Sequence, residues 1–340
     1  MIDFRYHLVS IVAVFLALAI GIVLGSTELQ GTTYNFLDRT TAKLQNEYDQ
    51  TRGQLATAQA QANEGEAYAQ AIEPAVLHDL LPGRRLLIVT EPGASSAAVA
   101  GISTAAADAG ATVTGQIALQ PKFFDTSATW RDSLNQTTLD LNQTISVPLT
   151  SSGSYQQQAA QLIASQILAS STSASTSTGQ GGNAQSVLAA YAQAGFLTTT
   201  GQPATEASLV VVVTPQTVPA DGSADQLDQV LVPLVTELAA KSSATVVAGT
   251  QAGSGAGSPI AVLRSNDVAN QVSTVDDADL VSGQTVVIQA LAAMLGGAKA
   301  ASYGFAANGA TAVAPSPAPT PSASASPSAT TTPSSNKKAK

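Results

Sequence analysis

Residues Leu8 to Gly25 read LVSIVAVFLALAIGIVLG, a run of apolar or small side chains without a charge. That length is close to what a helix needs to cross the hydrocarbon core of a bilayer. The rest of the chain is polar, acidic overall or globular in its pattern. We therefore expect this stretch to hold the protein at a membrane. We assign the membrane anchor to residues 8–27 and a short cytoplasmic segment to residues 1–7.

The charges around the anchor predict its orientation. Arg5 precedes the apolar run, whereas Glu28 follows it and Arg39 is the first basic residue beyond. Positive charge favours the cytoplasmic side, so we expect a single-pass protein of the cell membrane with its bulk outside the cytoplasm, where association with an outer envelope layer also fits. A cleaved secretory signal is the alternative, but the basic segment is weak and the apolar core is long for one.

Small residues recur at every fourth position of the anchor. Gly21 and Gly25 form a GxxxG pattern, and small side chains on one face let two membrane helices approach closely. The sequence therefore predicts a homodimer and gives the membrane dimer face as Ala13, Ala17, Gly21 and Gly25. The simpler alternative is that Ala and Gly are common in any apolar helix.

A helical stalk over residues 28–80 is predicted by apolar positions at steps of three and four, the spacing of a coiled coil. The stronger seam residues are Tyr34, Leu37, Leu44, Tyr48 and Leu55. Forty residues of helix would span about 60 Å. An amphipathic helix packed on its own domain is the alternative, and Pro74 is expected to end the pattern.

The composition limits the possible chemistry. The 340 residues have a formal net charge of −9 and include no cysteine. A thiol nucleophile, a disulfide and a thiolate metal site are therefore excluded, and the acidic balance gives no reason to expect nucleic-acid binding. Hydrophobic residues make up 44% of the chain, which is enough for a substantial core.

Residues 81–310 alternate between short apolar runs and helical patterns. Four consecutive valines in Leu209 to Thr214 indicate a central parallel strand buried on both faces. Strands are expected at 84–90, 111–119, 209–214 and 244–249, with helices at 94–109, 127–141, 155–169, 186–194, 224–241 and 284–295. This alternation predicts a doubly wound, mostly parallel α/β domain outside the cytoplasm.

Two segments are too simple in composition to contribute to a core. Residues 170–184 are rich in Ser, Thr and Gly and are interpreted as a low-complexity surface loop. Residues 311–340 are almost entirely Ala, Pro, Ser and Thr before a short lysine-containing end, and we expect a disordered tail.

The loops that follow two strands are candidate anion sites, because a helix start presents free amides. One runs from Thr90 to Ser95 and the other, rich in glycine, from Thr250 to Ser258. Neither contains a Walker or dinucleotide-binding spacing, and no nucleophile elbow is evident. We therefore predict a non-enzymatic protein with no cofactor and no catalytic residues.

The acidic segment Asp276, Asp277 and Asp279 is a candidate for a hard cation such as calcium. It lacks the spacing of an EF-hand, so helix capping and solvation are the preferred explanation. The histidines, His7 and His78, are far apart in the sequence. The sequence thus predicts no metal site.

The N-terminal motif Asp3, Phe4, Arg5, Tyr6, His7, with the apolar run after it, resembles the MctB family of actinobacterial envelope proteins. The segments Thr274, Val275, Asp276, Asp277 and Tyr303, Gly304 are similar to the C-terminal pattern of that family. The family is labelled a copper transporter, and its corynebacterial relatives include SteB, a membrane partner in the control of cell-wall hydrolases. The resemblance implies a role in copper transport and homeostasis.

Copper ligands are scarce in this sequence. Copper(I) prefers thiolate or thioether and copper(II) prefers imidazole, yet the chain has two Met and two His. We therefore expect no direct copper binding. The favoured hypothesis is a dimeric, non-catalytic scaffold with membrane lipid and a membrane or cell-wall protein as partners; the alternatives are a SteB-like partner in cell separation and a channel-forming envelope transporter.

Overall fold

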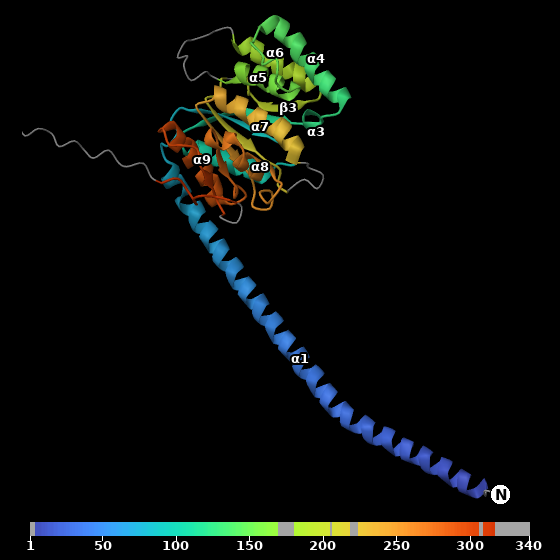
Figure 1. The fold of residues 1–340 in the computed structure, drawn as a ribbon. Coiled ribbons are helices and arrows are strands. Elements are labelled where there is room, and N and C mark those ends of the chain that lie inside the picture. Colours follow the sequence, from blue (N-terminus) through green and yellow to red (C-terminus); the bar gives the residue numbers. More distant parts are fainter. Residues whose placement is uncertain (1–3, 169–179, 205, 218–223, 306–308, 317–340) are drawn as a thin grey trace, which may run out of the picture. The chain divides into compact units, whose positions relative to one another are not determined.

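The computed structural model describes residues 4–168, 180–204, 206–217, 224–305 and 309–316. The chain divides into two compact units, Met1–Ala67 and Tyr68–Lys340. The first unit is helical, and the last turns of the same helix belong to the second unit. The helices and strands, shown in Figure 1, are α1 Phe4–Leu77, β1 Arg85–Thr90, α2 Ser96–Asp108, β2 Thr112–Leu119, α3 Pro121–Phe124, α4 Ala128–Ile145, α5 Tyr155–Ile167, α6 Gln180–Gln193, β3 Leu197–Gly201, β4 Leu209–Val213, α7 Ala224–Lys241, β5 Ala244–Ala248, α8 Pro259–Ser265, η1 Asp267–Asn270, β6 Ser273–Val275, α9 Val281–Leu295 and β7 Ser302–Tyr303.

The strands of the described residues form one sheet in the order β3-β2-β1-β4-β5-β6-β7. Every neighbouring pair is parallel except β2 with β3, which is antiparallel. All five residues of β4 and of β5 are buried, as expected for β-branched strands at the centre of a sheet with both faces covered. The predicted α/β class with a mostly parallel, doubly wound sheet is confirmed.

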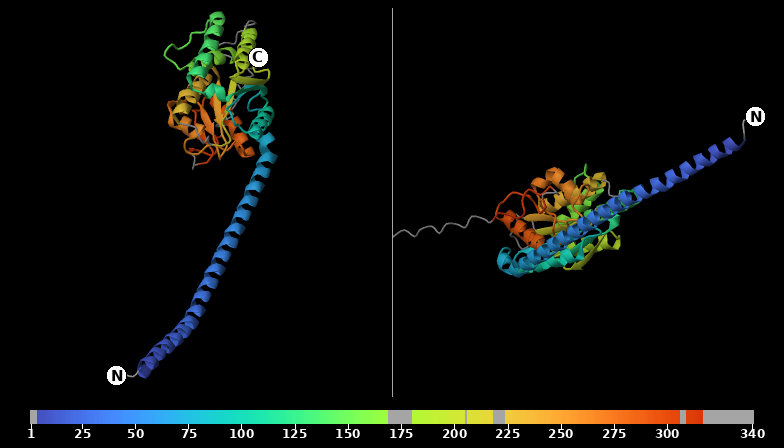
Figure 2. Two further views of the ribbon diagram at one scale, coloured as in Figure 1. Left: turned by 90° about the vertical axis from the view of Figure 1, so that its right-hand side faces the viewer. Right: turned by 90° about the horizontal axis from the view of Figure 1, so that it is seen from below.

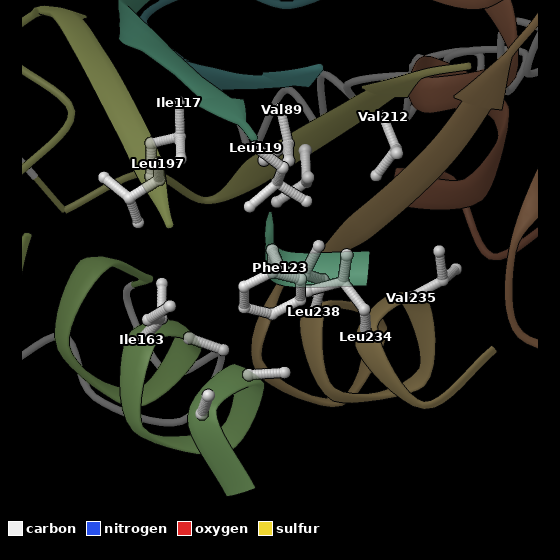
Figure 3. Packing of buried hydrophobic residues seen from close by; sticks show 14 of the residues in the cluster. Val89, Ile117, Leu119, Phe123, Ile163, Leu197, Val212, Leu234, Val235 and Leu238 are labelled. Carbon is white, nitrogen blue, oxygen red and sulfur yellow. The ribbon is translucent and has the colours of Figure 1, made fainter. Parts of the chain in front are cut away.

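Helices cover both faces of the sheet (Figures 1 and 2). One face packs on α2, on α9 and on the end of α1. The other face packs on α3 to α8, and Figure 3 shows Val89, Leu119 and Val212 of the sheet facing Phe123 and helix α7. The core is therefore two apolar layers, one on each side of a single sheet.

Helix α1 runs through Pro74 and ends at Leu77, within the predicted stalk of residues 28–80. Pro74, where the apolar pattern was expected to end, therefore does not end the helix. The carbonyl of Pro74 accepts a hydrogen bond from the amide of His78 at 3.1 Å. Leu77 is fully buried in the core of the second unit. This packing compensates for the backbone bond that proline removes.

Two boundaries differ from the sequence prediction. Helix α6 begins at Gln180, so the predicted loop 170–184 is shorter than expected, and residues 169–179 lie outside the described part. The predicted tail begins too early, because Ala312 forms a bridge with Tyr303 and Thr311 donates to the carbonyl of Ser302 at 2.8 Å. Residues 317–340 of that tail lie outside the described part.

Candidate functional site

The apolar N-terminal stretch is a single helix long and apolar enough to span a membrane, covering Tyr6–Gly25. Its large apolar side chains are exposed within the structure, which suits contact with lipid. On this helix the four-residue spacing places Ala13, Ala17, Gly21 and Gly25 along one side. A Cβ added at Gly21 or Gly25 would meet no atom within 4 Å. This side is therefore open in the single chain.

The predicted coiled-coil seam lies on a helix whose described side chains are exposed. Leu44, Tyr48 and Leu55 are exposed by 60%, 63% and 57%. Thr41, Leu44, Gln45, Glu47, Tyr48 and Thr51 line a shallow hollow along the helix. The backbone of Tyr34 and Leu37 is helical, while their side chains lie outside the described part. The seam thus leaves large apolar groups in solvent in the single chain.

The last turns of α1 behave differently, because within the second unit one side of them is packed. Glu73 is buried and accepts a hydrogen bond from the hydroxyl of Thr285 at 3.2 Å. Burial raises the pKa of the Glu73 carboxyl. The alternative of a helix packed on its own domain therefore holds for these turns.

The family-motif residues near the C-terminus converge on Arg264, which the sequence analysis did not identify. Its guanidinium contacts Oδ2 of Asp276 at 2.8 Å, and the two side chains are exposed by 8% and 0%. Nε donates to Thr274 at 2.9 Å, and Nη2 donates to the carbonyl of Tyr303 at 2.9 Å. A buried ion pair thus joins α8 to the ends of β6 and β7.

The same network explains Gly304. Oδ1 of Asp276 accepts a hydrogen bond from the amide of Phe305 at 2.8 Å. A Cβ at Gly304, where φ is +115°, would overlap that carboxylate, so only glycine fits there. The expectation that the acidic segment is solvated is wrong for Asp276 and Asp277, which are both buried. Val275 is the buried strand residue between them and Thr274.

Asp279 and the second glycine-rich loop form a further contact. The carboxylate of Asp279 accepts a hydrogen bond from the amide of Gln251 at 3.1 Å. Thr250 and Ser254 are buried, and the hydroxyl of Thr250 donates to the carbonyl of Gln216 at 2.7 Å. The loop is therefore held by buried hydroxyl groups.

The first candidate loop forms part of a pocket at the carboxyl ends of β1 and β2. Ser95 caps α2 by accepting a hydrogen bond from the amide of Ala98 at 3.2 Å. Glu91 precedes this cap and is 4% exposed. Burial raises the pKa of the Glu91 carboxyl to about 8. Sequence reasoning missed this group because Glu91 stands in a Glu-Pro-Gly turn, where an acid is ordinarily solvated.

The described residues contain no group of three or more His, Cys, Asp or Glu arranged to hold a metal ion. His7 lies on the candidate membrane-spanning helix, and Nδ1 of the exposed His78 is 3.3 Å from Oδ2 of Asp79. The sulfur of Met294 accepts a hydrogen bond from Ser273 at 3.3 Å. The donors that copper prefers are therefore dispersed in this part of the chain.

Comparison with known proteins identifies the family. Residues 1–315 match the family model described as copper transport outer membrane protein, MctB. The proteins named copper transporter MctB of Mycobacterium tuberculosis and Mycobacterium bovis are each 30% identical over 310 residues, covering 89% of this chain and 96% of the relative. The protein of that name from Mycobacterium leprae is 28% identical over 320 residues, covering 92% and 99%. The matched segment includes the candidate membrane-spanning helix, the rest of α1 and the α/β domain. The chain therefore belongs to the MctB family.

Proposed function

We propose that this protein acts in copper homeostasis at the cell envelope as a membrane-anchored, dimeric, non-catalytic scaffold whose role in copper handling is indirect. The family supports the link to copper, since the matched relatives are named copper transporters. The dispersal of copper-preferring donors in the described residues supports an indirect role. In this proposal the protein positions a membrane or cell-wall protein partner, and the partner handles the metal.

The observation that carries the proposal is the exposed apolar seam of the stalk. Leu44, Tyr48 and Leu55 follow the spacing at which two helices bury such side chains against each other. Burying one leucine contributes roughly 1.5–3 kcal/mol. A second copy of this chain offers a matching seam in register, and the open small-residue side of the membrane helix is compatible with the same two-fold arrangement.

The same sequence spacing continues in the second unit. Steps of three and four residues from Leu55 reach Ile72 and Val76, which are 37% and 39% exposed. Glu73 and Leu77, in the positions between and after them, are buried on the domain. The domain therefore buries the side of these turns that carries Glu73 and Leu77. Ile72 and Val76, which continue the spacing of the seam, stay partly exposed.

The proposed topology follows from charge. Arg5 lies before the membrane helix, and the first charge after it is Glu28. The positive-inside rule then places the N-terminus in the cytoplasm and the α/β domain outside it. A reporter enzyme that is active only outside the cytoplasm, fused after residue 316, is expected to be active.

Cysteine cross-linking tests the dimer, because the chain has no cysteine of its own. Leu44→Cys in native membranes is expected to form a covalent dimer on mild oxidation, since equivalent seam positions in a parallel pair bring their Cβ atoms within disulfide distance. Asn46→Cys, about 200° around the helix, is the matched control and is expected to remain monomeric. Equal cross-linking at both positions would contradict the proposed seam.

The physiological role is tested in a strain that lacks the gene. We expect cell-associated copper to rise, and complementation with a Leu44→Pro variant that inserts normally to leave it raised. Sensitivity to cell-wall hydrolases is measured in the same cultures, and it distinguishes the SteB-like role in cell separation from the role in copper homeostasis. Normal copper with altered lysis would assign the scaffold to cell separation instead.

A further inference from the structure

The pocket beside Glu91 lies at the carboxyl ends of β1 and β2, next to the point between β1 and β4 where the strand order reverses. The chain leaves β1 through α2 to β2 and leaves β4 through α7 to β5, so the two crossovers run in opposite directions from neighbouring strands. Helices α2 and α7 pack on opposite faces of the sheet. In open α/β sheets, ligands bind outside the carboxyl ends of the strands at such a switch point.

The loop after β1 is fixed in place. The amide of Glu91 donates to the carbonyl of Val213 at 2.9 Å, and the amide of Gln216 donates to the carbonyl of Gly93 at 2.8 Å. Ala94 forms a bridge with Pro215. The switch-point loop is thus held on both sides of Glu91, as a preformed site requires.

The pocket has a cavity volume of about 550 Å³, within the range of small-molecule sites. Val99 and Ala100 contribute apolar surface, and Glu91, Gln116 and Gln120 contribute polar groups. Among the described residues that line it, Glu91 carries the one ionisable side chain.

Glu91 is unsatisfied in the protein alone. Its Oε1 atom is buried and has no hydrogen-bond partner among the described residues. The carboxyl has no described basic neighbour that offsets its burial, and burial is the cause of its raised pKa. A buried oxygen without a partner is unfavourable, so an incoming hydrogen-bond donor is stabilised at this position.

The neighbouring amides leave the pocket with acceptors. Nε2 of Gln116 donates to the hydroxyl of Thr90 at 3.2 Å. Nε2 of Gln120 donates to the carbonyl of Ala118 at 3.3 Å and to the hydroxyl of Thr198 at 3.4 Å. Both amide nitrogens are thus directed at protein acceptors, and Gln120 uses both of its amide hydrogens in this way. The side-chain oxygens of Gln116, Gln120 and Glu91 are acceptors that a ligand donor can use.

We propose that this pocket binds a small organic cation through a primary ammonium group, which donates to the carboxyl of Glu91 while the aliphatic part of the ligand packs on Val99 and Ala100. An ammonium supplies three donors, which match the oxygens of this site, and its positive charge favours the ionised form of the Glu91 carboxyl. The start of α2 favours an anion by its dipole, but a buried carboxyl beside it disfavours one. Copper(I) finds no sulfur ligand among the lining residues.

Calorimetric titration of the full-length protein in a neutral detergent tests this proposal. The probes are n-butylammonium chloride, n-butanol and sodium butyrate, which share the same chain and differ in charge. At about pH 9 the alkylammonium is still charged, and we expect it to bind in preference to both other probes. Glu91→Gln is expected to weaken ammonium binding about tenfold or more.

Two variants complete the test. Asp132→Asn removes an exposed carboxylate on α4, and we expect it to leave ammonium binding unchanged. Ala100→Trp fills the pocket from the exposed side of α2 and retains Glu91. It is expected to abolish ammonium binding, and it replaces Glu91→Gln as the test if that variant does not fold. Unchanged ammonium affinity in both pocket variants, tighter binding of butyrate, or no binding of n-butylammonium by the wild type would overturn the proposal.

Discussion

Glu91 shows how a single buried carboxyl makes stability depend on pH. Its pKa rises from 4.5 to about 8 because burial disfavours the charged form. The stability that comes from the neutral carboxyl is fully present below pH 4.5 and is lost as the pH rises to about 8, since the unfolded chain ionises first. Between these limits the loss is roughly 1.4 kcal/mol for each pH unit.

The isosteric variant Glu91→Gln is therefore expected to match the wild type near pH 4.5 and to be more stable by several kcal/mol above pH 8. Chemical denaturation of the full chain in detergent, followed by fluorescence of the single tryptophan, Trp130, measures this difference. If the free energies of unfolding of the wild type and Glu91→Gln differ by the same amount at both pH values, Glu91 is ionised in the folded protein.

Arg264 is the second residue with a strong predicted effect. Replacement by Met keeps much of its volume and leaves Asp276 as a buried charge without its guanidinium partner. Breaking a buried ion pair from one side costs about 3–5 kcal/mol. The same denaturation measurement is expected to show a loss of this size for Arg264→Met.

The exposed pair Arg131 and Asp132 provides the control, at 3.9 Å with both side chains in solvent. Arg131→Met is expected to cost less than about 1 kcal/mol, because solvent screens exposed pairs. Equal costs at the two sites would mean that Arg264 and Asp276 are not coupled in the folded protein.

At the scale of elements, the strands and helices with strong periodicity could be predicted from sequence. The four valines of β4 and the helix α7 illustrate this, because their patterns match a buried strand and an amphipathic helix. Strand β3 was not predicted, since four of its five residues are exposed Thr or Gly at an antiparallel edge. Strands β6 and β7 have three and two residues, which is too short for a period to be visible.

The candidate site was predicted less completely than the fold. The sequence identified Asp276 and Gly304 as motif residues and placed Glu91 in a loop after a strand. The Arg264 partner was missed because it is 12 positions from Asp276 and on another element. Burial of Glu91 was missed because it depends on the loop after β4, which is distant in sequence. Local patterns do not contain such contacts.

The stalk of α1 gives the prediction at this scale. Leu44→Ser combined with Leu55→Ser removes the two seam leucines whose side chains are described, both of them exposed. Because each leucine contributes roughly 1.5–3 kcal/mol when buried, the dimer of the full chain is expected to dissociate at least about a hundredfold more easily. Analytical ultracentrifugation in a density-matched detergent measures this. Asn46→Ser combined with Thr57→Ser is the matched control, and a dissociation constant shared by both double variants would contradict the seam.

At the scale of the whole molecule, the two units suggest separate tasks. The first unit contains a single helix able to span a membrane, and the second contains the sheet, the buried ion pair and the pocket. A single apolar helix does not enclose a path for ions, since a pore needs polar groups facing a cavity between several elements. The proposed scaffold therefore leaves the passage of copper to a partner.

The most direct test of this account measures copper movement with the purified full-length protein in liposomes. Copper(I) would be placed outside vesicles that contain a copper indicator, and uptake would be compared with protein-free vesicles over a range of protein densities. The account predicts uptake equal to that of the empty vesicles at every density. Copper uptake that rises in proportion to the amount of protein would contradict the scaffold and identify the chain itself as the transporter.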